Sequence, residues 1–169
     1  MFCIKKVIFL DIDGVLNCRP YFEEIKKGKR KDEGEISGEY IMRLKEAVEK
    51  TEAVLVLSST WKKLKNIPVG EGGEVYQYLL KRLNDYGLSL YAETEETEGT
   101  WNRPLEVKTW IQKHAPEARF VSIDDDFSLE EYEKYGIGDC LIKTNFFCHN
   151  TAEGGIQDFH VQEICKKLC

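Results

Sequence analysis

Two aspartates, two positions apart, follow an apolar run near the start of the chain. The run Val7–Leu10 leads directly into Asp11, and Asp13 comes after one intervening residue. Gly14 follows the pair. Burial disfavours an ionised carboxylate, and a second carboxylate nearby adds repulsion. Two neighbouring carboxylates at the end of a buried strand are unfavourable if the strand is purely structural. We therefore expect a cation or a bound proton to balance their negative charge.

Polar residues also follow two later apolar runs. Ser58 and Ser59 come directly after the run 53–57, and the acids 124–126 come directly after the run 120–123. In an open α/β sheet the carboxyl ends of the strands meet at one edge, where ligands bind. We therefore expect the acids and the hydroxyls to converge although they lie far apart in the sequence.

The combination of residue types at this edge points to phosphate chemistry. Clustered acids need a cation, and their hard oxygen ligands favour Mg²⁺, which usually shares its coordination shell with substrate phosphate. Arg103, at the start of a predicted helix, supplies a fork of donors that suits a phosphate, as serine hydroxyls also do. The sequence predicts a Mg²⁺-assisted phosphoryl site, with the metal between Asp11 and the acids 124–126.

The elements that must position these residues alternate along the chain. Short apolar runs predict strands at 6–10, 53–57, 88–91, 120–123 and 140–143. Apolar residues at helical spacing predict helices at 39–50, 74–86, 104–115 and 156–168. Strands alternating with helices indicate an α/β fold with a mainly parallel sheet. The chain is expected to form one domain, 1–169, with 17–36 as a loop, a flap or a small cap insert.

Length, charge and cysteine content narrow the class of protein. The 169 residues suit one core, and no apolar run approaches the ~20 residues of a membrane helix. The net charge of −6 argues against a dedicated nonspecific nucleic-acid binder. Six cysteines without a CxxC pair, and no secretory signal, favour reduced thiols and a cytoplasmic location. Neither a membrane nor an obligate protein partner is expected.

The positive charge is nevertheless concentrated in two places. Lysines and an arginine cluster at 26–31, and three more lysines follow the second strand: Lys62, Lys63 and Lys65. A solvated surface is the simpler interpretation of both clusters. Both should lie near the catalytic edge, where they could attract a polyanion. Trp61 and Tyr21 could stack a base there, although packing in the core or the flap is the simpler role.

Four stretches of the chain resemble the motifs of the haloacid dehalogenase (HAD) superfamily of phosphohydrolases. DIDGVLN at 11–17 resembles the first motif, and LVLSST at 55–60 resembles the second. Asn102-Arg103-Pro104 resembles the third, and VSIDDD at 121–126 resembles the fourth. The motifs occur in order. The resemblance implies a Rossmann-like three-layer sandwich with a minimal (C0-type) cap.

The resemblance also implies roles for individual residues. Asp11 would be the nucleophile that forms an aspartyl-phosphate, and Asp13 the general acid and base, with its backbone carbonyl on Mg²⁺. Asp125 would be a metal ligand, with Asp124 beside it. The expected metal set is thus Asp11, Asp13, Asp124 and Asp125.

The second and third motifs would hold the transferring phosphoryl group. Ser58 would donate a hydrogen bond to it, with Ser59 as the alternative. Arg103 would neutralise its charge. Lys108 is the alternative for this role, although the following Pro104 favours Arg103.

The expected function is Mg²⁺-dependent hydrolysis of a phosphomonoester. SSTW, RPLEVKTWI and IDDD further resemble the small HAD-type domains fused to RNA-repair enzymes. This resemblance implies a phosphorylated nucleic-acid end or a nucleotide as substrate. The alternatives are a phosphorylated small molecule as substrate, a phosphotransferase with the same intermediate, a non-catalytic phosphate-binding module of the HAD fold, and, less consistent with DxDG, a phospho-accepting receiver domain.

Overall fold

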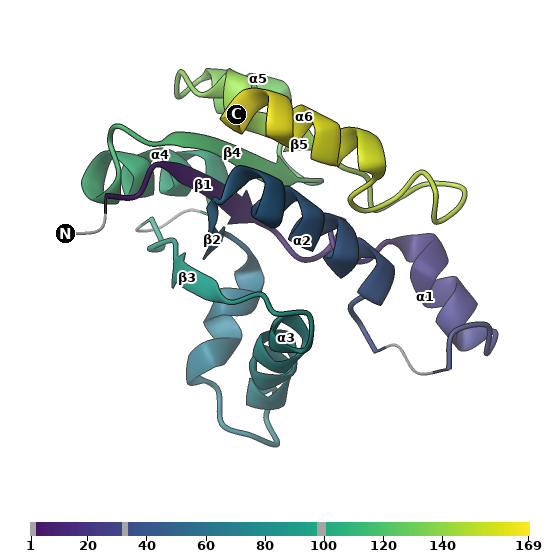
Figure 1. Ribbon diagram of the computed structural model, residues 1–169. Helices are drawn as coiled ribbons and strands as arrows, with labels where there is room; N and C mark the ends of the chain where they lie inside the picture. The colour runs from purple at the N-terminus through teal and green to yellow at the C-terminus, as the bar shows by residue number, and fades with distance from the viewer. Residues whose placement is uncertain (1–2, 32–33, 98–100) are drawn as a thin grey trace.

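A five-stranded parallel sheet lies at the centre of the computed structural model, which describes residues 3–31, 34–97 and 101–169 (Figure 1). The strands are β1 (Lys6–Leu10), β2 (Val54–Leu57), β3 (Leu90–Glu93), β4 (Arg119–Asp124) and β5 (Leu141–Lys143). Their order across the sheet is β3-β2-β1-β4-β5, and each neighbouring pair is parallel. This arrangement confirms the predicted α/β class.

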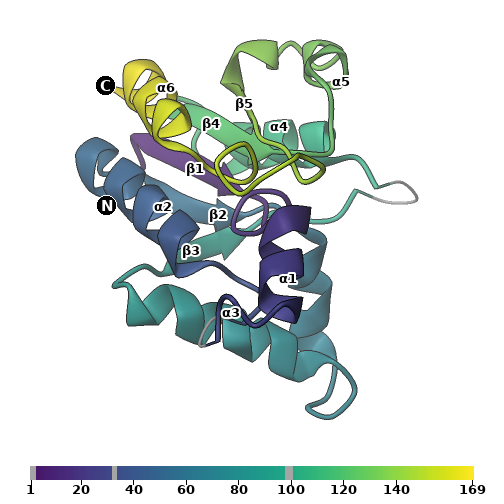
Figure 2. The same ribbon diagram turned by 90° about the vertical axis from the view of Figure 1, so that its right-hand side faces the viewer.

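Helices cover both faces of the sheet (Figure 2). The helical segments are α1 (Arg19–Lys26), α2 (Gly38–Thr51), η1 (Thr60–Asn66), α3 (Gly73–Asp85), α4 (Arg103–His114), α5 (Leu129–Glu133), η2 (Gly138–Cys140) and α6 (Asp158–Leu168). Residues of α2, α3 and α6 share one core cluster, and those of α4 belong to another on the opposite face. No helix in the described part of the chain is long and apolar enough to cross a membrane.

The central strand β1 shows why the two faces are equally apolar. Ile8 and Leu10 pack in the core of α2, α3 and α6, whereas Val7 and Phe9 pack in the core of α4. The Phe9 ring meets Trp110 of α4 edge-on, with 5.5 Å between the ring centroids. A strand covered on both faces reads as a continuous apolar run. The first polar residue after β1 therefore lies at the edge of the sheet.

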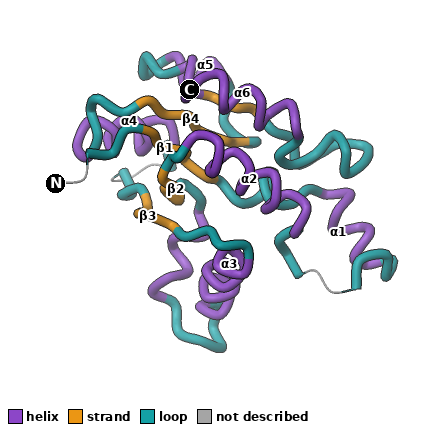
Figure 3. The backbone as a smooth tube through the Cα atoms, viewed as in Figure 1, coloured by secondary structure: helices purple, strands orange, loops and turns teal. Residues whose placement is uncertain are grey.

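The segment 17–36 differs from the predicted loop, because it contains α1, with residues 32 and 33 lying outside the described ranges. Pro20 occupies the first turn of α1, and Tyr21 is completely buried. Glycines and charged residues surround this short amphipathic helix, so its apolar periodicity is too brief to predict a helix from the sequence. Figure 3 shows α1 beyond the carboxyl end of β1, so the insertion between β1 and α2 consists of α1 and its loops.

Candidate active site

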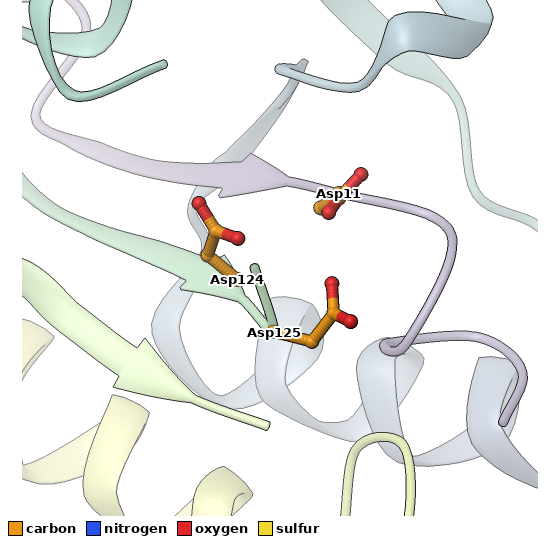
Figure 4. A group of neighbouring side chains, drawn as sticks. All are labelled: Asp11, Asp124 and Asp125. Carbon is orange, nitrogen blue, oxygen red and sulfur yellow. The ribbon is translucent and has the colours of Figure 1, made fainter. Parts of the chain in front are cut away.

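Three carboxyl groups meet where β1 and β4 end. Asp11 follows β1, Asp124 is the last residue of β4, and Asp125 comes next. Ligand oxygens of the three side chains lie within 4.8 Å of one another. Figure 4 shows the three carboxyl groups around one space beyond the strand tips. The parallel pairing of Leu10 with Ile123 places the following residues side by side and so explains the convergence.

Arg103 is the cation of this cluster. Its Nη1 donates to Asp11 Oδ2 and to Asp124 Oδ1, each at 2.8 Å, and the residue is 2% exposed. The first turn of α4 carries Arg103, and Asn102 caps this turn by accepting from Leu105 N at 3.1 Å. If all groups are ionised, three carboxylates and one guanidinium leave two negative charges, which a divalent cation would balance.

Burial raises the pKa of two acids of the cluster, Asp11 and Asp125. The pKa of Asp11 is raised well above its usual range by burial; Arg103 opposes this shift, and the neighbouring acids Asp124 and Asp125 add to it. Burial, together with Asp124 and Asp126, raises the pKa of Asp125 to about 6. A bound cation would favour the ionised carboxylates instead. The electrostatics of the cluster therefore favour binding of a cation.

Asp124 and Asp125 differ in how firmly they are held. Asp124 Oδ1 accepts from the backbone N–H groups of Asp126 at 2.8 Å and Phe127 at 3.3 Å, besides Arg103. Its Oδ2 accepts from Tyr132 Oη at 2.9 Å. Asp124 is fully buried, whereas Asp125 is partly open to solvent. These contacts leave Asp125 better placed to reach an entering ion and make Asp124 the fixed anchor of Arg103.

Gly14 belongs to the cluster through its backbone. Its φ of +76° lies in the left-handed region, which glycine adopts without strain. A Cβ at this position would also overlap the carboxyl group of Asp125. The glycine of the DIDG stretch therefore allows β1 and β4 to bring their acids together.

Asp13 lies apart from the three-carboxylate cluster. Its side chain is exposed, and its two oxygens accept from Trp61 Nε1 at 3.0 Å and Asn17 Nδ2 at 2.9 Å. Asn17 Oδ1 in turn accepts from Gly14 N at 2.9 Å. The carboxyl group is thus oriented by two side chains while staying accessible. The predicted ligation by Asp13 uses its backbone carbonyl and stays a prediction.

The two serines after β2 have different partners. Ser59 Oγ accepts from Trp61 N at 3.3 Å and caps η1. Ser58 is 1% exposed, and its Oγ has no hydrogen-bond partner within the described ranges. Arg103 Nε is likewise buried without a hydrogen-bond partner in the described part of the chain. An unpaired buried donor costs about 1–3 kcal/mol, so both atoms fit an oxygen-rich ligand, and the local geometry favours Ser58 over Ser59.

Two predicted cationic roles look different in the structure. Lys108 Nζ donates to the carbonyl of Tyr135 at 2.7 Å and is not brought to the cluster, so Arg103 fits the third motif better. Lys62 is 8% exposed and donates to Glu106 Oε2 at 2.6 Å and Thr94 Oγ1 at 2.9 Å. Burial and this ion pair make Lys62 unavailable to a polyanion. The pair instead holds η1 against the start of α4.

The remaining basic residues stay on the surface. Lys63 and Lys65 pair with acids of the neighbouring loop and strand, Glu96 at 3.8 Å and Glu93 at 3.2 Å. At the end of α1 and in the loop after it, the exposed lysines are Lys26, Lys27, Lys29 and Lys31. The second cluster is therefore largely neutralised, and only the first retains a run of exposed lysines.

The aromatic residues near the site also differ from the expectation. Trp61 and Tyr21 are 7% and 0% exposed, so neither offers a free face to a base; both pack in the core, and Trp61 also donates to Asp13. Sequence reasoning missed the aromatic neighbours of Arg103. Its Cζ lies 5.6 Å from the ring centroid of Trp101 and 5.3 Å from that of Phe127. The tryptophan one residue before the Asn102-Arg103-Pro104 motif was the available signal.

A family model described as the HAD domain in Swiss Army Knife RNA repair proteins matches residues 7–148. The chain belongs to this HAD family. The match confirms the resemblance to the RNA-repair group and, with the parallel sheet, the Rossmann-like fold. It supports a HAD-type phosphohydrolase at a coarse level, a class that generally uses Mg²⁺. The curated proteins and the solved structures contain no match to this HAD domain.

Proposed function

We propose that this HAD domain is a Mg²⁺-dependent phosphomonoester hydrolase that works through an aspartyl-phosphate. The observation that carries the proposal is the buried carboxylate of Asp11, held by Arg103 within a cluster of three acids. Metal-dependent phosphoryl transfer needs a nucleophile, a cation for the developing charge and a metal-binding pair of acids. These groups converge here from β1, α4 and β4.

In the first step, Asp11 attacks the phosphorus, and the bond from phosphorus to the leaving oxygen breaks. Asp13 protonates that oxygen. The carboxyl group of Asp13 is exposed and is oriented by Trp61 and Asn17, so it can reach the leaving oxygen of a substrate that binds from solvent. In the second step, Asp13 takes a proton from water, which attacks the aspartyl-phosphate and releases inorganic phosphate and free Asp11.

Other groups stabilise the phosphoryl oxygens during both steps. Arg103 neutralises charge on them while it holds Asp11, and Ser58 Oγ donates a hydrogen bond. Asp11, Asp125 and the backbone carbonyl of Asp13 would hold Mg²⁺, which would supply positive charge to balance the carboxylates and the phosphoryl oxygens. Asp124 keeps Arg103 in place.

The substrate class is the finer part of the proposal. A nucleotide or a phosphorylated nucleic-acid end as substrate is supported by the family's description and by the exposed lysines of the 26–31 cluster. A phosphotransferase would use the same intermediate with an alcohol in place of water. A cytoplasmic location stays a prediction.

Phosphate release tests the proposal. The substrates are nucleoside monophosphates, 3′- and 5′-phosphorylated oligonucleotides, sugar phosphates and a phosphotyrosine peptide, each with Mg²⁺ and with EDTA. Asp11→Asn should abolish release while circular dichroism and unfolding show an intact fold. The matched control is Asp85→Asn, a conservative change on the surface of α3. Turnover by Asp11→Asn would refute the mechanism, and binding of phosphate without any turnover would favour the binding module.

A further inference from the structure

The guanidinium of Arg103 lies between the acids and a pair of aromatic rings. On one side, Nη1 contacts Asp11 and Asp124. On the other side, the guanidinium carbon faces Trp101 and Phe127. The two rings meet edge-on, with centroids 5.2 Å apart and an interplanar angle of 78°. The aromatic pair, Trp101 and Phe127, is therefore part of the immediate surroundings of the site.

Trp101 is unusual because it is both at the site and open to solvent. It is 53% exposed, whereas Arg103 is 2% exposed. Two carboxylates, Asp11 and Asp124, already hold the guanidinium of Arg103, so the indole ring is not needed to keep it in place. A single exposed aromatic residue is common on protein surfaces, so its position beside Arg103 is the informative observation. An exposed indole beside a phosphoryl site provides a flat surface on which a planar group can stack.

We propose that Trp101, supported by Phe127, is the stacking surface for a nucleobase carried by the phosphomonoester that Asp11 cleaves. This inference rests on the proposed function and deepens it by naming the class of leaving group. Stacking of bases on aromatic side chains tolerates any base, because every base has a π-face. The platform would thus select for a nucleotide or a nucleic-acid end without reading its sequence.

The spacing favours a nucleobase over an aryl phosphate. The guanidinium of Arg103 lies against the ring of Trp101 and also contacts Asp11. We expect a ring stacked on Trp101 to be separated from the phosphorus by several bonds, because this guanidinium lies between the ring and the nucleophile. Ribose provides such a spacer between base and phosphate. In an aryl phosphate, such as phosphotyrosine, the ring is bonded directly to the phosphate oxygen, so we expect weaker stacking on Trp101.

A purely structural role makes a different prediction. If the aromatic pair only shields Arg103, its loss will reduce turnover of every phosphomonoester to the same extent. If Trp101 stacks the base, its loss will affect only substrates that carry a nucleobase. Selectivity between two substrates therefore separates the two roles.

The test compares kcat/KM for adenosine monophosphate, glycerol phosphate and phosphotyrosine with Mg²⁺ present. Trp101→Leu should lower kcat/KM for the nucleotide by about 5- to 150-fold, chiefly through KM. Its value for glycerol phosphate should change less than about twofold, and Trp101→Phe should restore most of the nucleotide activity. The control is Tyr91→Leu, since Tyr91 is 59% exposed on β3 at the edge of the sheet. This change should leave all three substrates unaffected.

Several outcomes would overturn the inference. Equal losses for the nucleotide and glycerol phosphate would show that Trp101 only covers Arg103. Unchanged nucleotide kinetics would show that the ring is idle, and a loss as large for phosphotyrosine would remove the assignment to a nucleobase. If the wild-type protein hydrolyses neither these three nor any phosphorylated oligonucleotide or sugar phosphate, the proposed function fails. Calorimetric binding of adenosine monophosphate and glycerol phosphate to wild type and Trp101→Leu then decides the stacking by itself.

Discussion

Replacing Arg103 by methionine should destabilise the protein by about 3–5 kcal/mol at pH 7, the usual cost of removing one partner from a buried ion pair. The guanidinium contacts Asp11 and Asp124 at 2.8 Å each, and the exposed fractions of the three side chains are 2%, 5% and 0%. Methionine keeps much of the apolar stem but removes the charge. Two buried carboxylates then lose their cation.

The loss should depend on pH and on Mg²⁺. The folded-state pKa of Asp11 already lies well above its ordinary value, and removal of Arg103 raises it further. The protonated acid no longer needs a cation, so the destabilisation should be smaller at pH 5 than at pH 7. The proposed binding of Mg²⁺ to the folded cluster should recover part of the loss at pH 7.

Urea unfolding at both pH values, with Mg²⁺ and with EDTA, measures these differences. The matched control is Arg19→Met, because Arg19 forms an exposed i,i+4 pair with Glu23 at 3.3 Å. Exposed pairs contribute about 0–1 kcal/mol, so this variant should stay close to wild type. A loss below about 1 kcal/mol for Arg103→Met at pH 7 would refute the reasoning, because a buried pair that held the acids would cost more.

Two further predictions concern the same cluster. The pKa of Asp125 in the folded state is about 6, above its ordinary value of 3.8. Between these pH values the metal-free folded state holds a proton that the unfolded state has lost. The free energy of unfolding should therefore fall as pH rises from 3.8 to about 6. Asp125→Asn should remove this fall, seen as the wild-type minus variant difference in urea with EDTA; identical profiles would contradict the assignment. Gly14→Ala should cost about 1–3 kcal/mol and weaken Mg²⁺ binding, since it adds left-handed strain and overlap with Asp125. Gly28→Ala has a similar φ, +71°, with nothing within 4 Å, so an equal loss of stability in both variants would show that the overlap is harmless.

The sequence alone predicted the fold class and the convergence of Asp11 with the acids after β4. A continuous apolar run predicted β1, because a strand buried on both faces has no polar side. Parallel strands end at one edge, so the acids after β1 and β4 had to approach each other whatever the details of the loops. Asp11, Asp124 and Asp125 could therefore be grouped before any coordinates were known, and the family match agrees with the motifs on which that grouping rests.

Other features were decided only by contacts between distant segments. Ser58 and Ser59 are equivalent in the sequence, and they differ because η1 takes Ser59 as its cap. Lys62 looks like a surface cation until Glu106, 44 residues away, buries it in an ion pair. The proposed stacking role of Trp101 depends on its contacts with Arg103 and Phe127, which the sequence does not reveal. Local patterns determine which edge of the sheet a residue reaches, whereas the partner that its side chain finds there depends on how helices from separate parts of the chain pack together.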